Sequence, residues 1–502
     1  MGHIDSFYPL LVSIPGLELR DGVYYRNLYR AVTREDVQRV GAVARNIGHF
    51  TLTDDIGSAC GHPIHPGEIV HLQQAHSRFS AGPLLPSLRT LEIVNARASL
   101  DHLSILLTPS LTSLKVVNVD QTHQIAIWSF LGKLLQEGAS LSEITLGPGA
   151  ITSDLLRASL RFTNLTRLEV VGAFSFDFED LKQVGCCPQL RDFTLDARNS
   201  VYTTGRYQAQ GGWKWPDLDD SEPGNIPRMP DFERSGFKHL TALQVFGTLE
   251  LMKDLCQSVI SKKLQELKLT LVWRHPSTGV TENKDKLTAI QTTEAFVREV
   301  LQGALAKWYF TLTKLVICRE GGRSSEHVIP CRTFAKFEDS RSLEELDIDG
   351  FCLTGQWNDV RIALPWKMKV LHLPIEMGSC QITLKELRSI ALKFSRLTSF
   401  RCLISDISDV PIYPKRKAAP ALDALSHCLQ TLSVGNLTPS ADPGRLLFVA
   451  RYLNLLFPNL EDIATHKNYN EKQWKSIADL IDLCHDVRLD EMSRASRLDG
   501  RN

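Results

Sequence analysis

Several features that define other classes of protein are missing from this sequence. No run reaches the roughly 18 consecutive apolar residues of a membrane-spanning helix, and the first residues lack the basic and then apolar pattern of a secretory signal. Neither sign of charge is in excess, because 57 Lys and Arg residues balance 57 Asp and Glu residues. This balance gives no general attraction to nucleic acid or to acidic membranes, so we expect neither as a main partner.

Common signatures of catalytic and metal-binding sites are also missing. The sequence contains no G-x-S-x-G, no G-x-x-x-x-G-K-[ST], no H-E-x-x-H, and no G-x-G-x-x-G after an expected strand. The 11 cysteines are scattered and never spaced C-x-x-C, which favours reduced thiols used as small core residues in the cytoplasm or the nucleus. We therefore expect no catalytic residue, no cofactor and no bound metal.

One histidine-rich segment leaves a metal-dependent enzyme as a remote alternative. The segment CGHPIHPGEIVHLQQAH begins at Cys60, and its histidines run from His62 to His76. Cysteine, histidine and glutamate are zinc ligands, but the spacing here, which Pro and Gly interrupt, matches no zinc finger. The other interpretation is a solvated insertion between two repeats.

A repeated pattern of apolar residues is what the sequence does contain. One apolar residue is followed by two more, three and five positions later, in 15 candidate units that recur about every 32 residues. The units begin at Ile14, Ile47, Leu88, Leu111, Leu141, Leu165, Leu190, Leu240, Leu264, Leu312, Leu343, Met368, Leu397, Leu429 and Leu460. The last two apolar residues of a unit face one side of a β-strand, and the first anchors the approach to it.

Segments between these units carry signals of helices. Thr383 and Glu386 form a capping-box pattern ahead of LKELRSIALKF, and Thr33 and Asp36 precede another helical stretch. Apolar residues are also spaced helically over 123–137, 291–307 and 471–484. Units of this kind bury their apolar faces only by stacking, so we predict an α/β fold: an irregular solenoid with a curved parallel sheet inside and helices outside. The alternative is two or three ordinary α/β domains whose strands begin alike.

The pattern also predicts how the chain is divided. Residues 1–46 are expected to form an N-terminal helical cap, residues 47–485 the solenoid, and residues 486–502 a polar C-terminal tail. Two inserts interrupt the solenoid, at residues 197–236 and 273–290, and the second has the composition of a plain polar loop.

The first insert holds Tyr207, Trp213 and Trp215 among many turn-forming residues. Long loops in compact repeats are either functional or disordered, and tryptophan and tyrosine are side chains that anchor interfaces. Two interpretations stay open: the insert binds a partner, or its aromatic side chains fold back onto the solenoid.

Residues that lie between the buried anchors are expected to face the concave side of the stack, the surface with which repeat proteins bind their partners. The candidate protein-binding residues are Arg167, Glu169, Asp192, Asp196, Glu266, Lys268, Glu345, Asp347, Asp349, His372 and Arg401. The most concentrated charge is carried by Glu345, Asp347 and Asp349, at alternate positions of one strand, where the carboxylates repel one another. A basic partner would compensate this repulsion if it docked there; the alternative is a solvated strand face.

Several segments resemble the leucine-rich-repeat family, and more closely the divergent repeat region of F-box/leucine-rich-repeat proteins of the kind expanded in mushroom-forming fungi. These segments are LLPSLRTLEI (84–93), TPSLTSLKVV (108–117), CPQLRDFTLD (187–196), SRSLEELDID (340–349) and FPNLEDIATH (457–466). Residues 24–52 are similar to the segment that follows the F-box in such proteins. The asparagine or cysteine that the family places three residues after the third apolar position is replaced by Ala96, Val119, Gly149, Ala173 and Arg198.

The resemblance implies a non-enzymatic substrate-recognition subunit of a ubiquitin ligase. Such a subunit binds a protein substrate with its repeats and a Skp-type adaptor with an F-box upstream. No F-box is visible in the sequence, so attachment to a ligase is implied by the relatives and not by these residues. A stand-alone scaffold or regulatory binder is therefore the alternative.

Overall fold

The structure is a computed structural model that divides into two compact units, Met1–Ser261 (unit 1) and Lys262–Asn502 (unit 2). The residues that it describes are 2–26, 31–53, 64–80, 82–95, 100–149, 151–172, 175–198, 201–203, 236–273, 282–321, 326–339, 342–375, 378–405, 427–435, 443–465 and 471–499.

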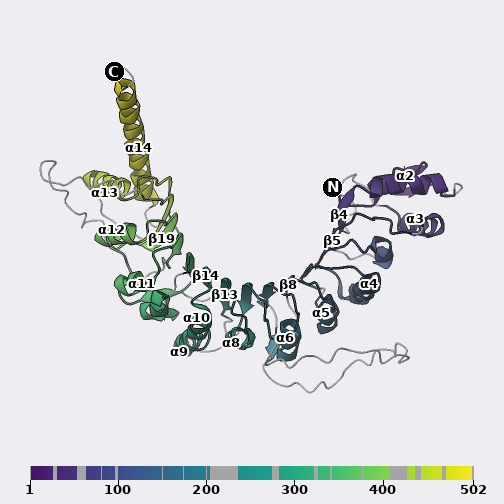
Figure 1. The fold of residues 1–502 in the computed structure, drawn as a ribbon, viewed down its shortest axis with the longest axis horizontal. Helices are drawn as coiled ribbons and strands as arrows, with labels where there is room; N and C mark the ends of the chain where they lie inside the picture. The colour runs from purple at the N-terminus through teal and green to yellow at the C-terminus, as the bar shows by residue number, and fades with distance from the viewer. Residues whose placement is uncertain are drawn as a thin grey trace. The chain divides into compact units, whose positions relative to one another are not determined.

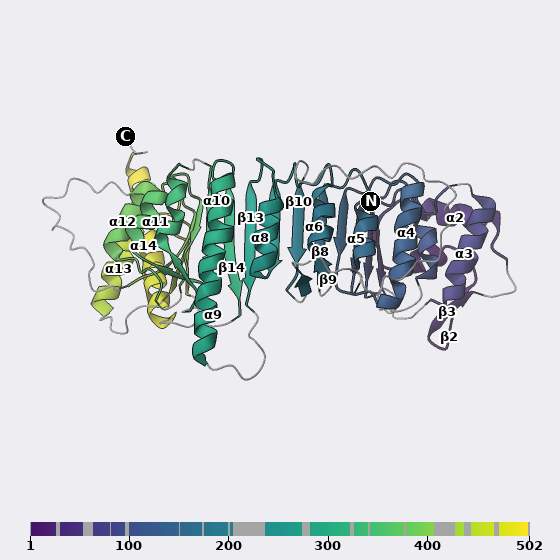
Figure 2. The same cartoon turned by 90° about the horizontal axis from the view of Figure 1, so that it is seen from below.

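Unit 1 consists of a parallel sheet covered on one face by helices. Across the sheet the strands are β1 (Gly2–Ile4), β4 (Ile47–Thr53), β5 (Thr90–Val94), β6 (Ser113–Val117), β7 (Glu143–Leu146), β8 (Arg167–Val171), β10 (Asp192–Asp196) and β12 (Ala242–Gly247). The helices are α1 (Tyr8–Leu11), α2 (Arg34–Ala44), α3 (Pro66–Phe79), α4 (Gln124–Gln136), α5 (Ser153–Ser159), α6 (Phe178–Gly185) and α8 (Leu249–Ser258), with short 3-10 turns η1 (Asp101–Leu106) and η2 (Gln121–His123). Helices α3 to α6 lie side by side on one face, and no helix of the described residues covers the other, concave face (Figures 1 and 2).

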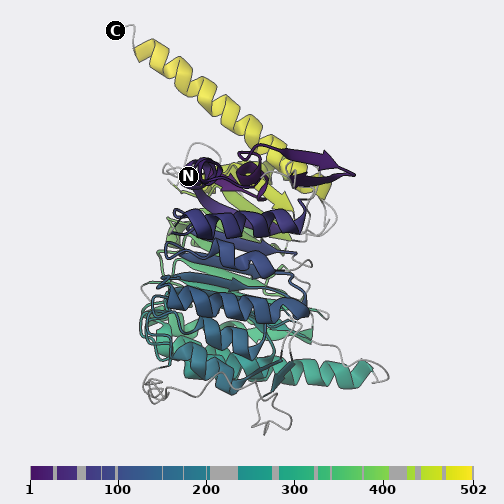
Figure 3. The ribbon, with the colours of Figure 1, turned by 90° about the vertical axis from the view of Figure 1, so that its right-hand side faces the viewer.

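Unit 2 repeats this arrangement. Its sheet is formed by β13 (Glu266–Val272), β14 (Lys314–Glu320), β16 (Glu345–Asp349), β18 (Val370–His372), β19 (Ser399–Leu403), β20 (Thr431–Gly435) and β21 (Asp462–Thr465), all parallel. Its helices are α9 (Glu282–Ala295), the π-helical turn η3 (Phe296–Leu301), α10 (Gln302–Trp308), the 3-10 helix η5 (Cys331–Asp339), α11 (Trp357–Ala363), α12 (Leu384–Lys393), α13 (Pro443–Leu456) and α14 (Glu471–Asp499). Helices α10 to α13 cover one face of the sheet, and α14 projects beyond the rest of the unit (Figures 1 and 3).

The strands are held in one register by the second apolar residue of each predicted repeat. In unit 1 the aligned residues are Phe50, Leu91, Leu114, Ile144, Leu168, Phe193 and Leu243. In unit 2 they are Leu267, Leu315, Leu346, Leu371, Phe400, Leu432 and Ile463. Ile463, on the last strand, is partly exposed; each of the other 13 residues is at most 1% exposed, and burying such a side chain stabilises the fold by about 1.5–3 kcal/mol. The predicted α/β solenoid with a parallel sheet and external helices is therefore confirmed.

The N-terminal end differs from its prediction. Leu17 and Leu19, expected to belong to the first repeat, lie in β2 (Leu17–Arg20), which pairs antiparallel with β3 (Val23–Arg26) outside the main sheet. The main sheet begins instead with β1, which pairs parallel with β4. Residues 1–46 thus contain three strands in addition to the expected helices, because short backbone pairing needs no apolar triplet.

Two further expectations from the sequence are corrected. The insert at residues 273–290 is not a plain polar loop, because α9 begins at Glu282 and continues through η3 into α10. The stretch from residue 486 is not a separate tail, because α14 is helical as far as Asp499. The helices predicted over 123–137, 291–307 and 471–484 are all present.

Local capping explains where several helices begin. Thr33 with Asp36, and Thr383 with Glu386, form the capping boxes that the sequence predicts, at the starts of α2 and α12. In each box the threonine side chain accepts a backbone N–H and the acidic side chain accepts the threonine N–H, so two otherwise unpaired donors are satisfied.

An asparagine pair stands one position before the place that the repeat family uses. Asn95 and Asn118 follow β5 and β6 with φ of 55° and 54°, a left-handed conformation that asparagine tolerates. The side-chain amide of Asn118 donates to Asn95 Oδ1 at 3.0 Å. This pair links two adjacent turns, although the asparagines do not stand at the position that the repeat family uses.

Two minor parallel ladders accompany the main sheets. In unit 1, β9 (Ser175–Asp177) pairs with β11 (Val201–Thr203), and in unit 2, β15 (Val328–Pro330) pairs with β17 (Cys352–Thr354). Of the helices that the structure describes, none has the length and apolarity needed to cross a membrane.

Candidate functional site

The candidate binding surface of each unit is the helix-free face of its sheet. Side chains alternate along a strand, so the residues that flank the buried anchors lie on this face. All the predicted residues occupy such positions: Arg167 and Glu169 on β8, Asp192 and Asp196 on β10, Glu266 and Lys268 on β13, Glu345, Asp347 and Asp349 on β16, His372 on β18, and Arg401 on β19. The first four belong to unit 1 and the other seven to unit 2.

In unit 1 the predicted residues form local ion pairs, and threonines of neighbouring repeats donate to two of them: Thr145 Oγ1 to Glu169 Oε2 at 3.5 Å, and Thr241 Oγ1 to Asp192 Oδ1 at 3.3 Å. Arg167 Nη2 lies 3.9 Å from Glu169 Oε2, and both side chains are well exposed. Asp196 is buried, and both of its carboxylate oxygens accept from the guanidinium of Arg198, at 2.9 Å from Nε and 2.5 Å from Nη2. Asp196 is therefore neutralised within the chain and offers little to a partner.

Unit 1 carries a second charged group, which was not among the predicted residues. Lys115 Nζ on β6 lies 3.1 Å from Glu92 Oε2 on β5, and His49 Nε2 on β4 lies 3.4 Å from Glu92 Oε1. The repeat pattern could have predicted this group, because all three residues lie between the apolar anchor residues of their repeats.

In unit 2 four of the seven predicted residues form one network centred on Asp347, with Asp349, His372 and Arg401. Arg401 Nη2 donates to Asp347 Oδ1 at 2.8 Å, and His372 Nδ1 lies 3.3 Å from Asp347 Oδ2. The same guanidinium donates to the carbonyl of Ile348 at 2.9 Å and lies 3.9 Å from Asp349 Oδ1. Only 13% of the Arg401 side chain is exposed, so this network joins three strands in a partly dehydrated position.

Lys314, which the sequence analysis did not select, pairs with Glu345. Its Nζ lies 2.8 Å from Glu345 Oε2, across the pairing of β14 with β16. The hydrogen bond to Glu345 raises the pKa of Lys314; together with the charges of Glu345, Glu266 and Asp347 it outweighs burial, which lowers the pKa.

Opposing effects act on the pKa of Asp347. Burial raises its pKa, but the hydrogen bond from His372 and the charges of Arg401, His372 and Lys268 outweigh burial and hold the pKa below its ordinary value. Burial, assisted by Asp347 and Asp349, raises the pKa of the neighbouring Cys318 thiol to about 11. The carboxylate is thus ionised and the thiol neutral at physiological pH.

These contacts show that the acidic triplet does not need a partner for its compensation. The chain itself supplies the basic groups: Lys314 for Glu345, and Arg401 for Asp347. Asp349 keeps 52% of its side chain exposed, and its ion pair within the described part of the chain is the 3.9 Å contact with Arg401, so it is the most accessible carboxylate of the triplet.

The histidine-rich segment is a helix from Pro66 onwards. His65 caps α3, where its Nδ1 accepts the backbone N–H of Gly67 at 3.2 Å, and its ring stacks on Tyr25. Cys60 and His62 lie outside the described residues, and no group of three potential metal ligands occurs among the residues that are described. The described part of the segment thus serves as a cap and a helix of the repeat.

The aromatic residues of the first insert cannot be placed on either surface. Tyr207, Trp213 and Trp215 lie within residues 204–235, outside the described part of the chain. Both interpretations of this insert therefore stay as predictions.

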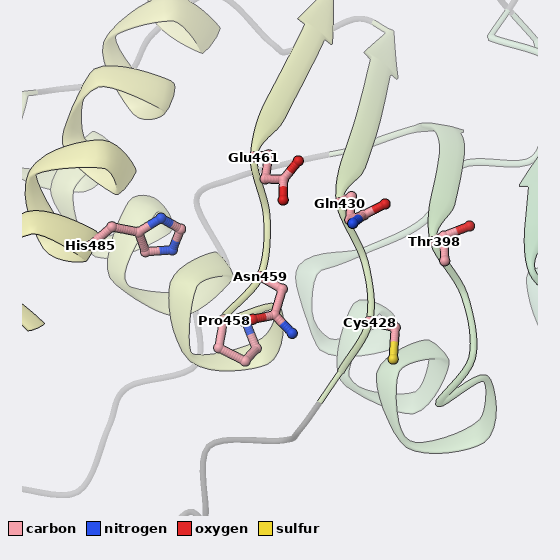
Figure 4. Close-up of a pocket in the computed structure, with 7 residues that line it drawn as sticks. All are labelled: Thr398, Cys428, Gln430, Pro458, Asn459, Glu461 and His485. Atoms are coloured by element: carbon pink, nitrogen blue, oxygen red, sulfur yellow. The ribbon is translucent and has the colours of Figure 1, made fainter. Parts of the chain in front are cut away.

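An open pocket of about 430 Å³ lies in unit 2, where β19, β20 and β21 begin (Figure 4). It is lined by Thr398, Cys428, Gln430, Pro458, Asn459, Glu461 and His485. His485 comes from α14, and Figure 4 places it on a different side of the pocket from Cys428. The lining thus presents a thiol, an amide, a carboxylate and an imidazole as hydrogen-bonding groups.

Comparisons with known proteins give no family. No family model matches the chain, and no curated protein matches its sequence. Among solved structures, a Bacteroides fragilis protein determined by a structural genomics consortium is similar with a TM-score of 0.27 and 10% identity, over 72% of this chain and 67% of that one. A similarity of this size says nothing about function.

Proposed function

We propose that the chain is a non-enzymatic protein-binding repeat protein, and that its partner docks on the helix-free face of the unit 2 sheet. The observation that supports this most is the network on β14, β16, β18 and β19, where Asp347 and Arg401 hold each other in place. Groups that are already ordered lose less conformational freedom on binding, which favours their use as a docking surface.

The exposed charges indicate the chemistry of the partner. Asp349 and Glu266 are exposed carboxylates at the edge of the network, whereas Arg401 is already occupied by the chain's own acceptors. A partner that presents lysine or arginine side chains would therefore find acceptors there, and rim charges of this kind govern specificity and association rate.

The resemblance to F-box/leucine-rich-repeat proteins extends the proposal to substrate recognition for a ubiquitin ligase. In that role the docked partner is the substrate and a Skp-type adaptor binds elsewhere. A stand-alone scaffold or regulatory binder is the alternative, and it needs no adaptor. Co-purification of the complete gene product with the adaptor separates the two, because only the ligase subunit would retain it.

Reversal of the charges of Asp349 and Glu266, the exposed carboxylates at the edge of the network, tests the docking surface. Protein carrying Asp349→Lys and Glu266→Lys should lose the partners that wild-type protein captures from a native extract. The two carboxylate acceptors are then replaced by cations, which repel the basic side chains of the partner. The matched control carries Glu294→Lys and Asp479→Lys, two exposed carboxylates on α9 and α14. Loss in both double variants, or in neither, would exclude the helix-free face as the docking surface.

A further inference from the structure

The open pocket where β19, β20 and β21 begin is built from the same position of three successive repeats. Thr398, Gln430 and Glu461 each precede one of these strands by one residue. The Gln430 N–H donates to the Thr398 carbonyl at 2.9 Å, and the Glu461 N–H donates to the Gln430 carbonyl at 2.8 Å. These backbone hydrogen bonds set the spacing of the three side chains, which follow one another along one edge of the sheet (Figure 4).

The chain's own hydrogen bonds leave three acceptors of the lining open. Asn459 Nδ2 donates to the carbonyl of His427 at 3.0 Å, and since a carbonyl accepts only from the NH2 end of an amide, Asn459 Oδ1 is left without a partner in the described residues. The Thr398 hydroxyl donates to the carbonyl of Lys369 at 3.0 Å, so towards a ligand it can only accept. The Glu461 carboxylate is exposed and makes no hydrogen bond or ion pair within the described part of the chain.

The charge beside these acceptors is not balanced by a basic side chain of the lining. Glu461 is the acidic residue of the pocket, and none of the seven lining residues is a lysine or an arginine. Lys369 lies next to Thr398 at the same edge, but its Nζ is 2.6 Å from Glu344 Oε2, so its charge is compensated there. Open acceptors around an uncompensated carboxylate favour a cation that carries several N–H donors, and they disfavour an anion.

We propose that this pocket binds a guanidinium group, carried either by an arginine side chain or by a small arginine-like molecule. A guanidinium is planar and has five N–H donors in a fixed fork, which pairs with both oxygens of a carboxylate such as Glu461 and leaves donors for Asn459 Oδ1 or Thr398 Oγ1. A lysine ammonium has the same charge but is a compact donor, so it satisfies fewer of these acceptors. The volume of about 430 Å³ lies within the range of about 300–1,000 Å³ that is usual for sites of small ligands.

This site is separate from the docking surface proposed above. Its lining residues do not include any member of the network of Asp347, Asp349, His372 and Arg401. One of its sides is formed by His485 of α14, a helix that contributes nothing to that network (Figure 4). Either proposal can therefore fail while the other holds.

Calorimetric titration of the full-length protein with matched small ligands tests the site. Nα-acetyl-L-arginine amide represents an arginine within a protein chain, free L-arginine represents a small molecule, and Nα-acetyl-L-citrulline amide is the uncharged isostere. We expect at least one of the two guanidinium ligands to bind and the citrulline derivative not to bind, because its urea group keeps the shape but loses the charge. Binding of the capped derivative alone identifies a protein side chain as the source, and binding of free arginine alone identifies a small molecule. Failure of both to bind, or equal binding of the citrulline derivative, would overturn the proposal.

Two substitutions of neighbouring carboxylates assign the binding to Glu461. Glu461→Gln should weaken the affinity for the guanidinium ligand by about tenfold or more, because a charge-assisted pair of hydrogen bonds is lost. The matched control is Asp462→Asn, which removes the same charge from an exposed residue that does not line the pocket. It should bind as wild-type protein does. Equal losses in the two variants would mean that general negative charge, and not the pocket, attracts the ligand.

The thiol of Cys428 reports where the ligand is bound. Cys428 is exposed and lines the pocket, whereas the partly exposed Cys186 belongs to unit 1. A saturating guanidinium ligand should slow the alkylation of Cys428 by iodoacetamide, followed by mass spectrometry, and leave the rate at Cys186 unchanged. An unchanged rate at Cys428 in the presence of bound ligand would place the ligand elsewhere and refute the assignment.

Discussion

At the scale of single residues, Arg401 is the group on which the unit 2 network depends most. Its guanidinium donates to Asp347 at 2.8 Å and to the carbonyls of Ile348 at 2.9 Å and Leu373 at 3.3 Å. We expect Arg401→Ala to lower the free energy of unfolding by about 1–3 kcal/mol, because these acceptors would lose their donor where water is partly excluded. Urea unfolding measures the loss.

Arg167→Ala in unit 1 is the control for that change. The Arg167 side chain is 56% exposed and its contact with Glu169 is 3.9 Å long. Such pairs contribute little, so the control should change the free energy of unfolding by less than about 0.5 kcal/mol. Equal losses in the two variants would mean that the network adds nothing beyond an ordinary surface charge.

His327 gives the protein a specific dependence on pH. The side chain is 0% exposed, its Nδ1 lies 2.7 Å from Thr293 Oγ1, and burial with the charge of Arg319 lowers its pKa to about 4. In the unfolded chain the pKa is about 6.5, so the unfolded state binds the extra proton first. Stability is then complete above pH 6.5 and falls by up to about 1.4 kcal/mol per pH unit as the pH drops towards 4.

Urea unfolding at pH 7, 6 and 5 tests this dependence by comparison of wild-type protein with His327→Gln. The variant should be less sensitive to pH over this range, whatever its absolute stability, because the titrating group is gone. If the free energy of unfolding falls equally with pH in the two proteins, His327 does not contribute to the pH dependence.

The sequence predicted residue positions better than residue partners. Asp347 and Arg401 were placed on the same face because strand alternation follows from the backbone alone. Their pairing depends on the register of β16, β18 and β19, and on the depth at which Arg401 lies between them, neither of which an isolated strand pattern contains. For this reason the self-compensation of the acidic triplet was missed.

At the scale of elements, the capping box of α12 is the clearest agreement between sequence and structure. The Glu386 N–H donates to Thr383 Oγ1 at 3.2 Å, and the Thr383 N–H donates to Glu386 Oε2 at 2.7 Å. Thr383→Ala should cost about 1 kcal/mol of unfolding free energy, measured by urea or thermal denaturation, because an N-terminal donor loses its acceptor.

Thr248→Ala is the matched control for the capping prediction. Thr248 is the N-cap of α8, but its side chain makes no capping hydrogen bond. This substitution should therefore cost clearly less than Thr383→Ala. A cost as large as that of Thr383→Ala would attribute the effect to general helix-start propensity instead of the capping box.

Elements with strong local signals were predicted, and elements made by backbone pairing were not. Triplets such as Leu343, Leu346 and Ile348 mark β16 because each residue is buried at its own position. The strands β1, β15 and β17 are three residues long and have no triplet, so they exist only because a neighbouring backbone supplies partners. The helix that begins at Glu282 was missed because its first turns are polar.

At the scale of the whole molecule, a repeat architecture implies that stability is transmitted between neighbouring repeats. Leu346 is fully buried in β16, which pairs with β14 on one side and β18 on the other. Leu346→Ala should cost about 2–5 kcal/mol through the cavity that it leaves. Hydrogen exchange followed by mass spectrometry should show the largest loss of protection in β14, β16 and β18, and less in β21.

The same experiment tests whether unit 2 opens repeat by repeat or as a single cooperative unit. In a solenoid each repeat contacts only its neighbours, so local opening near β16 needs less free energy than the unfolding of all seven strands. An ordinary domain has one shared core, and a cavity there would reduce protection by the same amount in every strand. Uniform loss across unit 2 would therefore contradict repeat-wise cooperativity, whereas a gradient that falls with distance from β16 would support it.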